Sequence, residues 1–356
     1  MNIQDIISNA RETGLLNDVN FEKAMLTGVD FSSLRLEKVN FKNANLIGAN
    51  FDGSLLNKID FSDAKLQGAQ FDQSIIQESD FSNATLQNSS LQYTTFNKCN
   101  FNNTDLTSVG GENTHFTDCM LINSRLTHAK LHTSIWNGMT IKNTNFNNAD
   151  LFRLIAHGIK FENSTFDESN LTKAQFNGGN FESYKFQNCN LLMTSFDSCK
   201  MKGSDFSNTD LTQVNFNKAN LDNAIFINAR GDYTSFIESS ALKANFSNSN
   251  LNMSNFGNAK LSSSNWINAQ VTNSIFEEAE LNFANFENAK LDYSNFSNAQ
   301  TEQTNFNQAN LYYTNIHGIQ KARLDGANKL KTAFKTDTEL FQACSLIWAK
   351  GRVVSF

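Results

Sequence analysis

The stretch 79–103, SDFSNATLQNSSLQYTTFNKCNFNN, repeats one pattern every five residues. Its large apolar residues stand at equal intervals, at Phe81, Leu86, Leu91, Phe96 and Phe101. An α-helix has a period of 3.6 residues and a β-strand a period of two, so neither element alone gives this spacing. The stretch therefore predicts a backbone in which a short strand and a turn alternate regularly.

The same register runs through most of the chain. From Phe21 to Ile316, sixty positions follow one another in steps of five without an insertion, and Phe occupies 27 of them and Leu 21. A small residue stands two positions earlier, as at Ala44, and Asn or Asp stands directly before, as at Asn45. The repeating unit is therefore small–Asn/Asp–Phe/Leu–polar–polar. We call its Phe/Leu position the centre.

The composition supports a single hydrogen-bonded repeat. The 356 residues include 32 Phe and no Pro, whereas about 5% Pro is ordinary. Because Pro has no backbone N–H, its exclusion indicates that nearly every N–H is needed in a ladder. The net charge of −6 argues against direct nucleic-acid binding.

No membrane span is expected, because no run of eighteen apolar residues occurs. No cleavable leader is visible either. We therefore expect a protein that is cytoplasmic, or secreted without a cleavable signal peptide. Lys outnumbers Arg and Asn is abundant, which favours a bacterial source.

The repeat resembles the pentapeptide repeat family over about residues 19–317, as in ANLIGANF (44–51) and FENAKLDYSNF (286–296). The resemblance implies an all-β solenoid, a right-handed quadrilateral β-helix in which four pentapeptides make one coil of twenty residues. Sixty repeats then give about 15 coils. Centres and small residues would point inward and fill the interior at crystal-like density, while the other positions face water.

The two ends are expected to be short helical caps. In residues 1–18, apolar residues at helical spacing predict a helix over the first coil. Residues 318–356 are assigned to a C-terminal cap with a helix near 337–350. Its apolar residues are Leu340, Phe341, Cys344, Ile347 and Trp348. Related caps dimerise in the gyrase-targeting members of the family, so the resemblance also implies a homodimer through this segment.

The centres also predict a change in packing along the chain. From Phe21 to Phe81, Phe stands at every tenth residue, whereas after Phe166 it stands mainly at the alternate centres. The changeover lies between Leu91 and Phe161. We interpret this stretch as a zone where the aromatic stacks move to other faces, and a functional bend there is the alternative.

The cysteines and histidines, which could act in catalysis or bind a metal, are not expected to lie together in one site. Four cysteines occupy the inward small position and are interpreted as apolar fillers: Cys99, Cys119, Cys189 and Cys199. Cys99 and Cys119 are one coil apart, and we expect a reduced pair. The five histidines fall on outward positions of different coils, and no CxxC, P-loop or GxSxG occurs. We expect no catalytic residue, cofactor or metal, and not an enzyme.

One group of outward positions is rich in Tyr and Met, which are frequent in protein interfaces. This candidate protein-binding stripe comprises Phe152, Leu192, Met193, Tyr233, Met253, Tyr293, Tyr312 and Tyr313. The alternative interpretation is a set of unrelated exposed apolar residues, which are normal on protein surfaces.

Three functions are compatible with these observations. The first is a rigid protein-binding scaffold or adaptor with a protein partner, linked to a secretion system by family analogy alone. The second is a DNA mimic that binds DNA gyrase, as the quinolone-resistance members do. The repeat region has 29 acidic and 21 basic residues, while a duplex as long as fifteen strand spacings carries roughly 40 charges, so the mimicry is weak. The third is a secreted bacterial effector.

Overall fold

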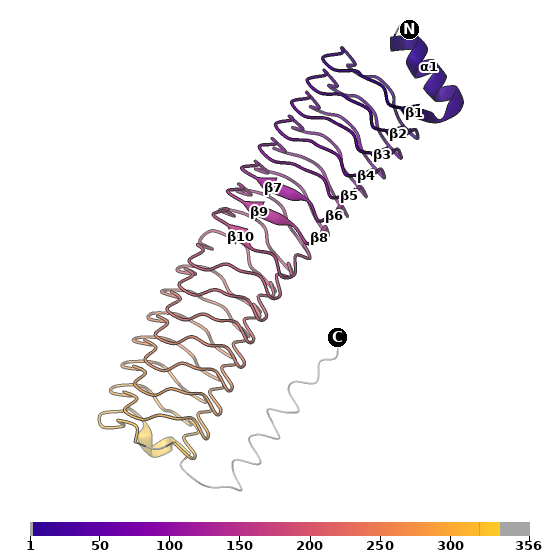
Figure 1. The fold of residues 1–356 in the computed structure, drawn as a ribbon. Coiled ribbons are helices and arrows are strands. Elements are labelled where there is room, and N and C mark those ends of the chain that lie inside the picture. The colour runs from indigo at the N-terminus through magenta and orange to yellow at the C-terminus, as the bar shows by residue number, and fades with distance from the viewer. Residues whose placement is uncertain (1–2, 320, 335–356) are drawn as a thin grey trace. The chain divides into compact units, whose positions relative to one another are not determined.

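The computed structural model describes residues 3–319 and 321–334, and these form an all-β parallel solenoid (Figure 1). The chain divides into two compact units. The first comprises Met1–Phe181 and Lys185–Ser195, and the second Glu182–Tyr184 and Phe196–Phe356. In both units parallel β-bridges join residues about twenty apart, so the five-residue period builds coils of four repeats.

The first unit holds the helix and the strands that are long enough to be named. Helix α1 (Ile3–Thr13) precedes them. The strands are β1 (Leu15–Asn17), β2 (Arg35–Glu37), β3 (Leu55–Asn57), β4 (Ile75–Gln77), β5 (Thr95–Asn97), β6 (His115–Thr117), β7 (Met120–Ile122), β8 (Ile135–Asn137), β9 (Thr140–Lys142) and β10 (Phe161–Glu162). They form a seven-stranded parallel sheet, β1-β2-β3-β4-β5-β6-β8, and a three-stranded one, β10-β9-β7. The described part of the second unit has isolated bridges and the short 3₁₀ helix η1 (Leu330–Thr332).

Each position of the repeat has a backbone role. The Asn or Asp before a centre accepts a hydrogen bond from the backbone N–H two residues on, as between Asn50 Oδ1 and Asp52 N at 2.9 Å. Two positions after the centre, φ is positive, between 49° and 64° where the residue is not Gly and belongs to this repeat. Asn, Gly and small polar residues adopt this left-handed conformation most easily, which explains the polar end of the unit.

Backbone hydrogen bonds run both ways between neighbouring coils. Phe41 N–H donates to Asp60 O at 2.7 Å, and Asn40 N–H donates to Val19 O at 2.9 Å. The buried hydroxyls are satisfied in the same ladder, since Thr94 Oγ1 donates to Phe71 O of the preceding coil at 2.6 Å. A Pro at most positions would remove one of these donors, so its absence follows from the ladder.

Aromatic rings stack along the interior. Phe226 lies on Phe246 with centroids 4.6 Å apart and planes 3° from parallel, and it meets Phe216 edge to face at 5.9 Å. The predicted change of faces is confirmed within the first unit. Phe61 stacks on Phe81 in one column, whereas the later Phe146 stacks on Phe166 in another.

Helix α1 covers part of the first coil, and Arg11 completes it. Ala10 of the helix is buried. The Arg11 guanidinium donates to Ser32 O at 3.0 Å and to Asp30 O at 2.9 Å, and it also pairs with the Asp30 carboxylate. In later coils the equivalent carbonyl accepts a backbone amide, as Asn50 O does from Phe31 N–H. Arg11 therefore replaces donors that a preceding coil would have supplied.

The ladder extends beyond both boundaries inferred from the sequence. Strand β1 begins at Leu15 rather than at 19. After 317, bridges join Asn305 to Arg323, Asn310 to Asn328 and Asn315 to Phe334. The spacing shortens there from twenty to eighteen or nineteen, so the five-residue phase is lost although the backbone still pairs.

The expected cap helix near 337–350 lies outside the described residues. So do Leu340, Phe341, Cys344, Ile347 and Trp348. Dimerisation through this segment stays a prediction. Within residues 3–319 and 321–334, no helix is long and apolar enough to cross a membrane.

Candidate functional site

The predicted stripe is divided between the two units. Phe152, Leu192 and Met193 belong to the first unit, where Phe152 is half-buried and the other two are exposed. The remaining residues belong to the second unit: Tyr233, Met253, Tyr293, Tyr312 and Tyr313. The second set is the larger and forms the candidate site.

Four residues of the second unit, each a multiple of twenty from the next, form what we call the Tyr/Met column: Tyr233, Met253, Tyr293 and Tyr313. Asn273 occupies the coil between Met253 and Tyr293. The three tyrosines are 42–58% exposed and Met253 is half-buried. Backbone amides tie each coil to the next at this position, as Met253 N–H does to Thr272 O at 2.9 Å. The ladder thus fixes the spacing of the side chains.

The backbone at the column is in the left-handed region. φ is 60° at Tyr233 and Tyr293, 55° at Met253 and 52° at Tyr313. A large side chain there costs about 1 kcal/mol or more relative to Gly, and Asn is better tolerated. A column on another side of the same unit follows that preference, with Asn228, Asn248, Asn268 and Asn288. The Tyr/Met column therefore departs from what the backbone favours.

The tyrosines at the end of the column contact one another. Tyr293 and Tyr313 are stacked with centroids 5.8 Å apart, and Tyr312 stands perpendicular to both, at 5.5 and 4.6 Å. Tyr313 also meets Phe334 at 5.5 Å. The pKa of Tyr293 is raised, first by its partial removal from water and then by Tyr312. The result is a packed aromatic surface with its edges in water.

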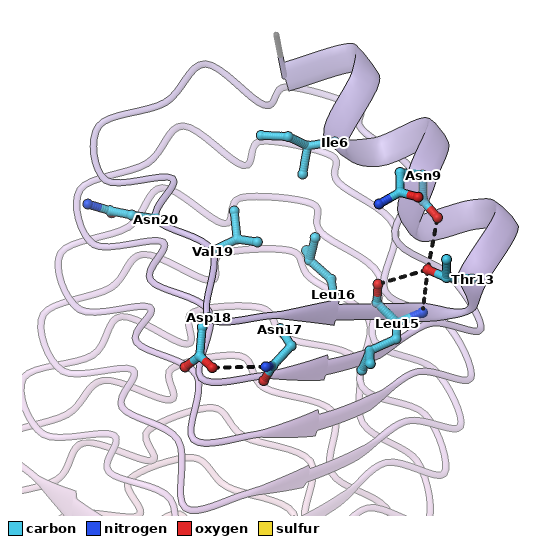
Figure 2. A pocket seen from close by; sticks show the side chains of 9 residues that line it. All are labelled: Ile6, Asn9, Thr13, Leu15, Leu16, Asn17, Asp18, Val19 and Asn20. Carbon is cyan, nitrogen blue, oxygen red and sulfur yellow. Dashed lines mark hydrogen bonds between the residues drawn. The ribbon is translucent and has the colours of Figure 1, made fainter. Parts of the chain in front are cut away.

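A hollow of about 680 Å³ separates α1 from the first coil. Figure 2 shows Ile6 of the helix facing Leu16 and Val19 across it. The Thr13 hydroxyl already donates to Asn9 O at 2.8 Å, and Asp18 accepts from Asn17 Nδ2 at 2.8 Å. The lining offers one carboxylate and no histidine, cysteine, lysine or arginine. The hollow exists because α1 covers only part of the first coil. Its lining residues do not form an acid–base pair or a nucleophile–base pair.

The predicted inward positions of the cysteines and outward positions of the histidines are confirmed, but His115, His128 and His132 lie within eighteen residues and so do not occupy three different coils. Cys99, Cys119, Cys189 and Cys199 are all buried, and Cys99 N–H donates to Cys119 Sγ at 3.3 Å. His132 Nε2 lies 2.7 Å from Asp150 Oδ2 on the surface. Among the described residues, no three His, Cys, Asp or Glu side chains gather to hold a metal ion.

The four buried cysteines are expected to be inert in the folded chain. Burial raises the pKa of Cys189 to about 12 and also raises that of Cys99, so almost none of either is thiolate at pH 8. The hydrogen bond with Cys99 lowers the pKa of Cys119, so the inertness of Cys119 rests on its burial away from the reagent. In a Cys344→Ser chain, a thiol reagent at pH 8 should label none of the four before unfolding and all four after denaturation. Rapid labelling of any one in the native protein would contradict the interpretation as fillers.

Several exposed apolar residues were not identified from the sequence. Leu15, Leu55 and Ile75 are 43–50% exposed on the outer face of the seven-stranded sheet. Phe283 of the second unit is 56% exposed at a left-handed position. The signal was present, because Leu15, Leu55 and Ile75 occupy the position before a centre, where Asn or Asp is usual.

Comparisons with known proteins agree with this fold. Family models described as "Pentapeptide repeat region" and "Pentapeptide repeats (8 copies)" match residues 15–95, 89–176 and 157–229, and residues 254–292 and 289–328. No curated protein matches the sequence.

Among solved structures, QnrB1, a plasmid-mediated fluoroquinolone resistance protein, is 17% identical over 68% of this chain and 99% of its own, with a TM-score of 0.29. HetL, a pentapeptide repeat protein involved in heterocyst differentiation regulation from the cyanobacterium Nostoc, is 16% identical over 95% and 98%, with a TM-score of 0.18. These likenesses concern the fold alone. The matched repeats, the bridges between coils and the buried Phe and Leu centres together place this chain in the pentapeptide repeat family.

Proposed function

We propose that this protein is a non-enzymatic, rigid protein-binding scaffold or adaptor, and that a protein partner binds along the Tyr/Met column of the second unit. The observation that carries the proposal is the presence of three exposed Tyr and a half-buried Met at left-handed positions of one column. Strained positions occupied by unfavourable residues are typical of functional sites. The proposal includes the finer architecture that the family implies, a right-handed quadrilateral β-helix of about 15 coils.

The chemistry of the column supports binding to protein. Tyr and Met are enriched in interface cores, and a Tyr ring adds a large contact area for only two rotatable bonds. The ladder holds neighbouring side chains one strand spacing apart, about 4.8 Å, so the surface is formed before a partner arrives. Little ordering entropy is then lost on binding.

Gyrase binding through DNA mimicry is not proposed. A mimic requires carboxylates gathered on one surface, whereas Asp205, Asp210, Asp222 and Glu238 belong to four different repeats of the coil and therefore to different sides. Asp210 is moreover paired with Arg230 at 3.4 Å. The experiment below would nevertheless detect gyrase subunits.

Replacing Tyr233, Met253 and Tyr293 together with Ser is expected to weaken partner binding at least tenfold and to leave folding intact. The side chains point outward, and Ser is easier to accommodate at φ near 60° than Tyr, so thermal stability should be equal or slightly higher. The test is capture from bacterial lysate by tagged full-length protein, with captured proteins identified by mass spectrometry and binding titrated.

The matched control is Lys243→Ser with Phe283→Ser, which alters another left-handed column of the same unit. The proposal requires that a protein captured by wild type and by this control is lost with the triple variant. If all three chains capture the same proteins equally, the Tyr/Met column is not the binding surface. Capture of gyrase subunits by all three would favour the DNA-mimic function instead.

A further inference from the structure

The charged groups around the tyrosine cluster of the second unit are mostly cationic. Lys290 lies one coil before Asn310, to which it is bridged, and Asn310 is bridged to Asn328 of the next coil. That next coil carries Lys329, which is the N-cap of the 3₁₀ helix η1, and Lys331, which lies within it. All three lysines are exposed. Three exposed ammonium groups therefore lie within three successive coils of the second unit.

These lysines belong to the same surface as the tyrosines. Lys290 stands three residues before Tyr293, immediately before the centre of the same repeat. Tyr313 N–H donates to Thr332 Oγ1 at 3.4 Å, and the Tyr313 ring meets Phe334 at 5.5 Å, so the turn with Lys329 and Lys331 lies against the cluster. The segment that carries Lys329 and Lys331 therefore adjoins the tyrosine cluster through Thr332 and Phe334.

The cations near the cluster are not neutralised within the described chain. Lys321 pairs with Glu302 at 3.6 Å, but Lys290, Lys329 and Lys331 form no ion pair with any described residue. Two carboxylates remain near these lysines in the sequence, Asp292 and Asp325; Asp292 accepts from Asn310 Nδ2 at 2.8 Å, which directs one of its oxygens to the amide but leaves its negative charge in place. At the opposite end of the column Tyr233 has the same neighbours in the sequence, Arg230 three residues before and Asp232 directly before, but there the cation is paired, since Arg230 Nε lies 3.4 Å from Asp210 Oδ2.

We propose that the occupant of the tyrosine end of the column is an acidic polypeptide segment, whose Asp or Glu side chains meet Lys290, Lys329 and Lys331 while its apolar side chains lie on Tyr293, Tyr312 and Tyr313. This inference rests on the proposed function and names the partner's chemistry. A cationic partner is disfavoured by the three ammonium groups. A nucleic acid is less favoured because its phosphates are evenly spaced and cannot avoid Asp232 and Asp292, whereas a peptide can place its carboxylates at the lysines and neutral residues opposite the two aspartates.

The test selects the partner's chemistry without assuming a sequence. A phage-displayed library of random 16-residue peptides is selected on full-length wild type and counter-selected on Tyr293→Ser with Tyr313→Ser. Selected peptides are expected to be net negative, with Asp or Glu next to Leu, Ile, Phe or Tyr. The best synthetic peptide is then titrated by fluorescence anisotropy, and its affinity should fall severalfold when salt is raised.

Reversing the charge of the lysines distinguishes a specific acidic partner from nonspecific adsorption to exposed aromatic rings. Lys329→Glu with Lys331→Glu should weaken the selected peptide at least tenfold. The matched control, Lys243→Glu with Lys260→Glu, changes the net charge equally on exposed residues of another side of the unit, and should change affinity less than twofold. Circular dichroism and thermal unfolding should be unchanged in both, because all four side chains face water.

Several outcomes would overturn the inference. These are enrichment of neutral or basic peptides, failure to enrich any, and equal weakening by the two lysine variants. Displacement of the peptide by single-stranded oligothymidylate with the same lysine dependence would assign the surface to nucleic acid. If one of these outcomes occurs while capture from lysate still depends on the Tyr/Met column, the inference of an acidic partner is wrong and the proposed function stands. If capture does not depend on the column, the proposed function is wrong as well.

Discussion

Replacing Trp266 with Ala is expected to lower the local unfolding free energy of the second unit by about 3–5 kcal/mol. Trp266 is fully buried at a centre. It stacks on Phe246 at 4.0 Å and on Phe286 at 5.3 Å, and it meets Phe256 and Phe276 edge to face at 5.1 and 5.5 Å. Removing the ring leaves a cavity and takes one ring contact from each of four aromatic neighbours.

Hydrogen exchange is the appropriate measurement, because long repeat arrays need not unfold in one step. Amides of the coils around Trp266 should exchange roughly 100-fold faster or more, since each 1.4 kcal/mol is a factor of ten. Trp266→Phe is the control. It restores the usual centre residue and loses chiefly the bond from Trp266 Nε1 to Ser264 Oγ at 2.7 Å, so protection should change far less. Equal protection in wild type and Trp266→Ala would contradict the packing account.

Gly231→Ala is expected to destabilise its coil by about 1–3 kcal/mol, although the sequence suggests the opposite. Gly231 occupies a centre where Phe or Leu is usual, and so it resembles a vacancy that a larger residue could fill. An added Cβ would lie 2.5 Å from Leu211 C and 2.7 Å from Thr212 N. These are backbone atoms of the preceding coil, held by the ladder. The clash exceeds the fraction of a kcal/mol that Ala gains by restricting the unfolded chain.

Gly111→Ala provides the matched comparison. It is also a glycine at a centre, but its added Cβ would meet the side-chain atoms Leu131 Cδ2 at 2.6 Å and Thr114 Oγ1 at 2.8 Å. The Leu131 end can rotate away and neither atom belongs to the backbone, so this change should cost less than Gly231→Ala, although shifting Thr114 Oγ1 strains its bonds to Leu91 O and Gly111 O, both 2.8 Å. Exchange rates around the two sites would check the difference. A larger loss for Gly111→Ala than for Gly231→Ala would show that the backbone contact does not decide the outcome.

The interior was predictable from the sequence because Phe or Leu at a centre is buried throughout the regular coils. A Phe or Leu at every fifth position, as at Phe226 and Leu221, has a single inward orientation in a regular coil, and both are buried. The paired spacing of twenty followed from the family resemblance. The fillers Cys99 and Cys199 were likewise placed correctly, since their position in the unit determines their burial.

The ends and the outer surface were less predictable. The ladder beyond Ile316 was missed because the spacing shortens, so Leu324 no longer falls in phase with the earlier centres. The capping by Arg11 depends on where a flexible side chain reaches, and no periodicity encodes it. The left-handed conformation at Tyr233 was not predicted, because a Tyr by itself gives no indication of a positive φ.

The ladder also bears on how such a chain changes in evolution. Within the described residues, the ladder joins each coil to the one directly before it and the one directly after it, and it uses the same positions of the repeat each time. A gene duplication or deletion that adds or removes the codons of one whole coil would preserve every partner, whereas one that covers a single pentapeptide would bring each later side chain to a different face. Within a unit, the length of the chain can thus change by whole coils in evolution while each side chain stays on the same face.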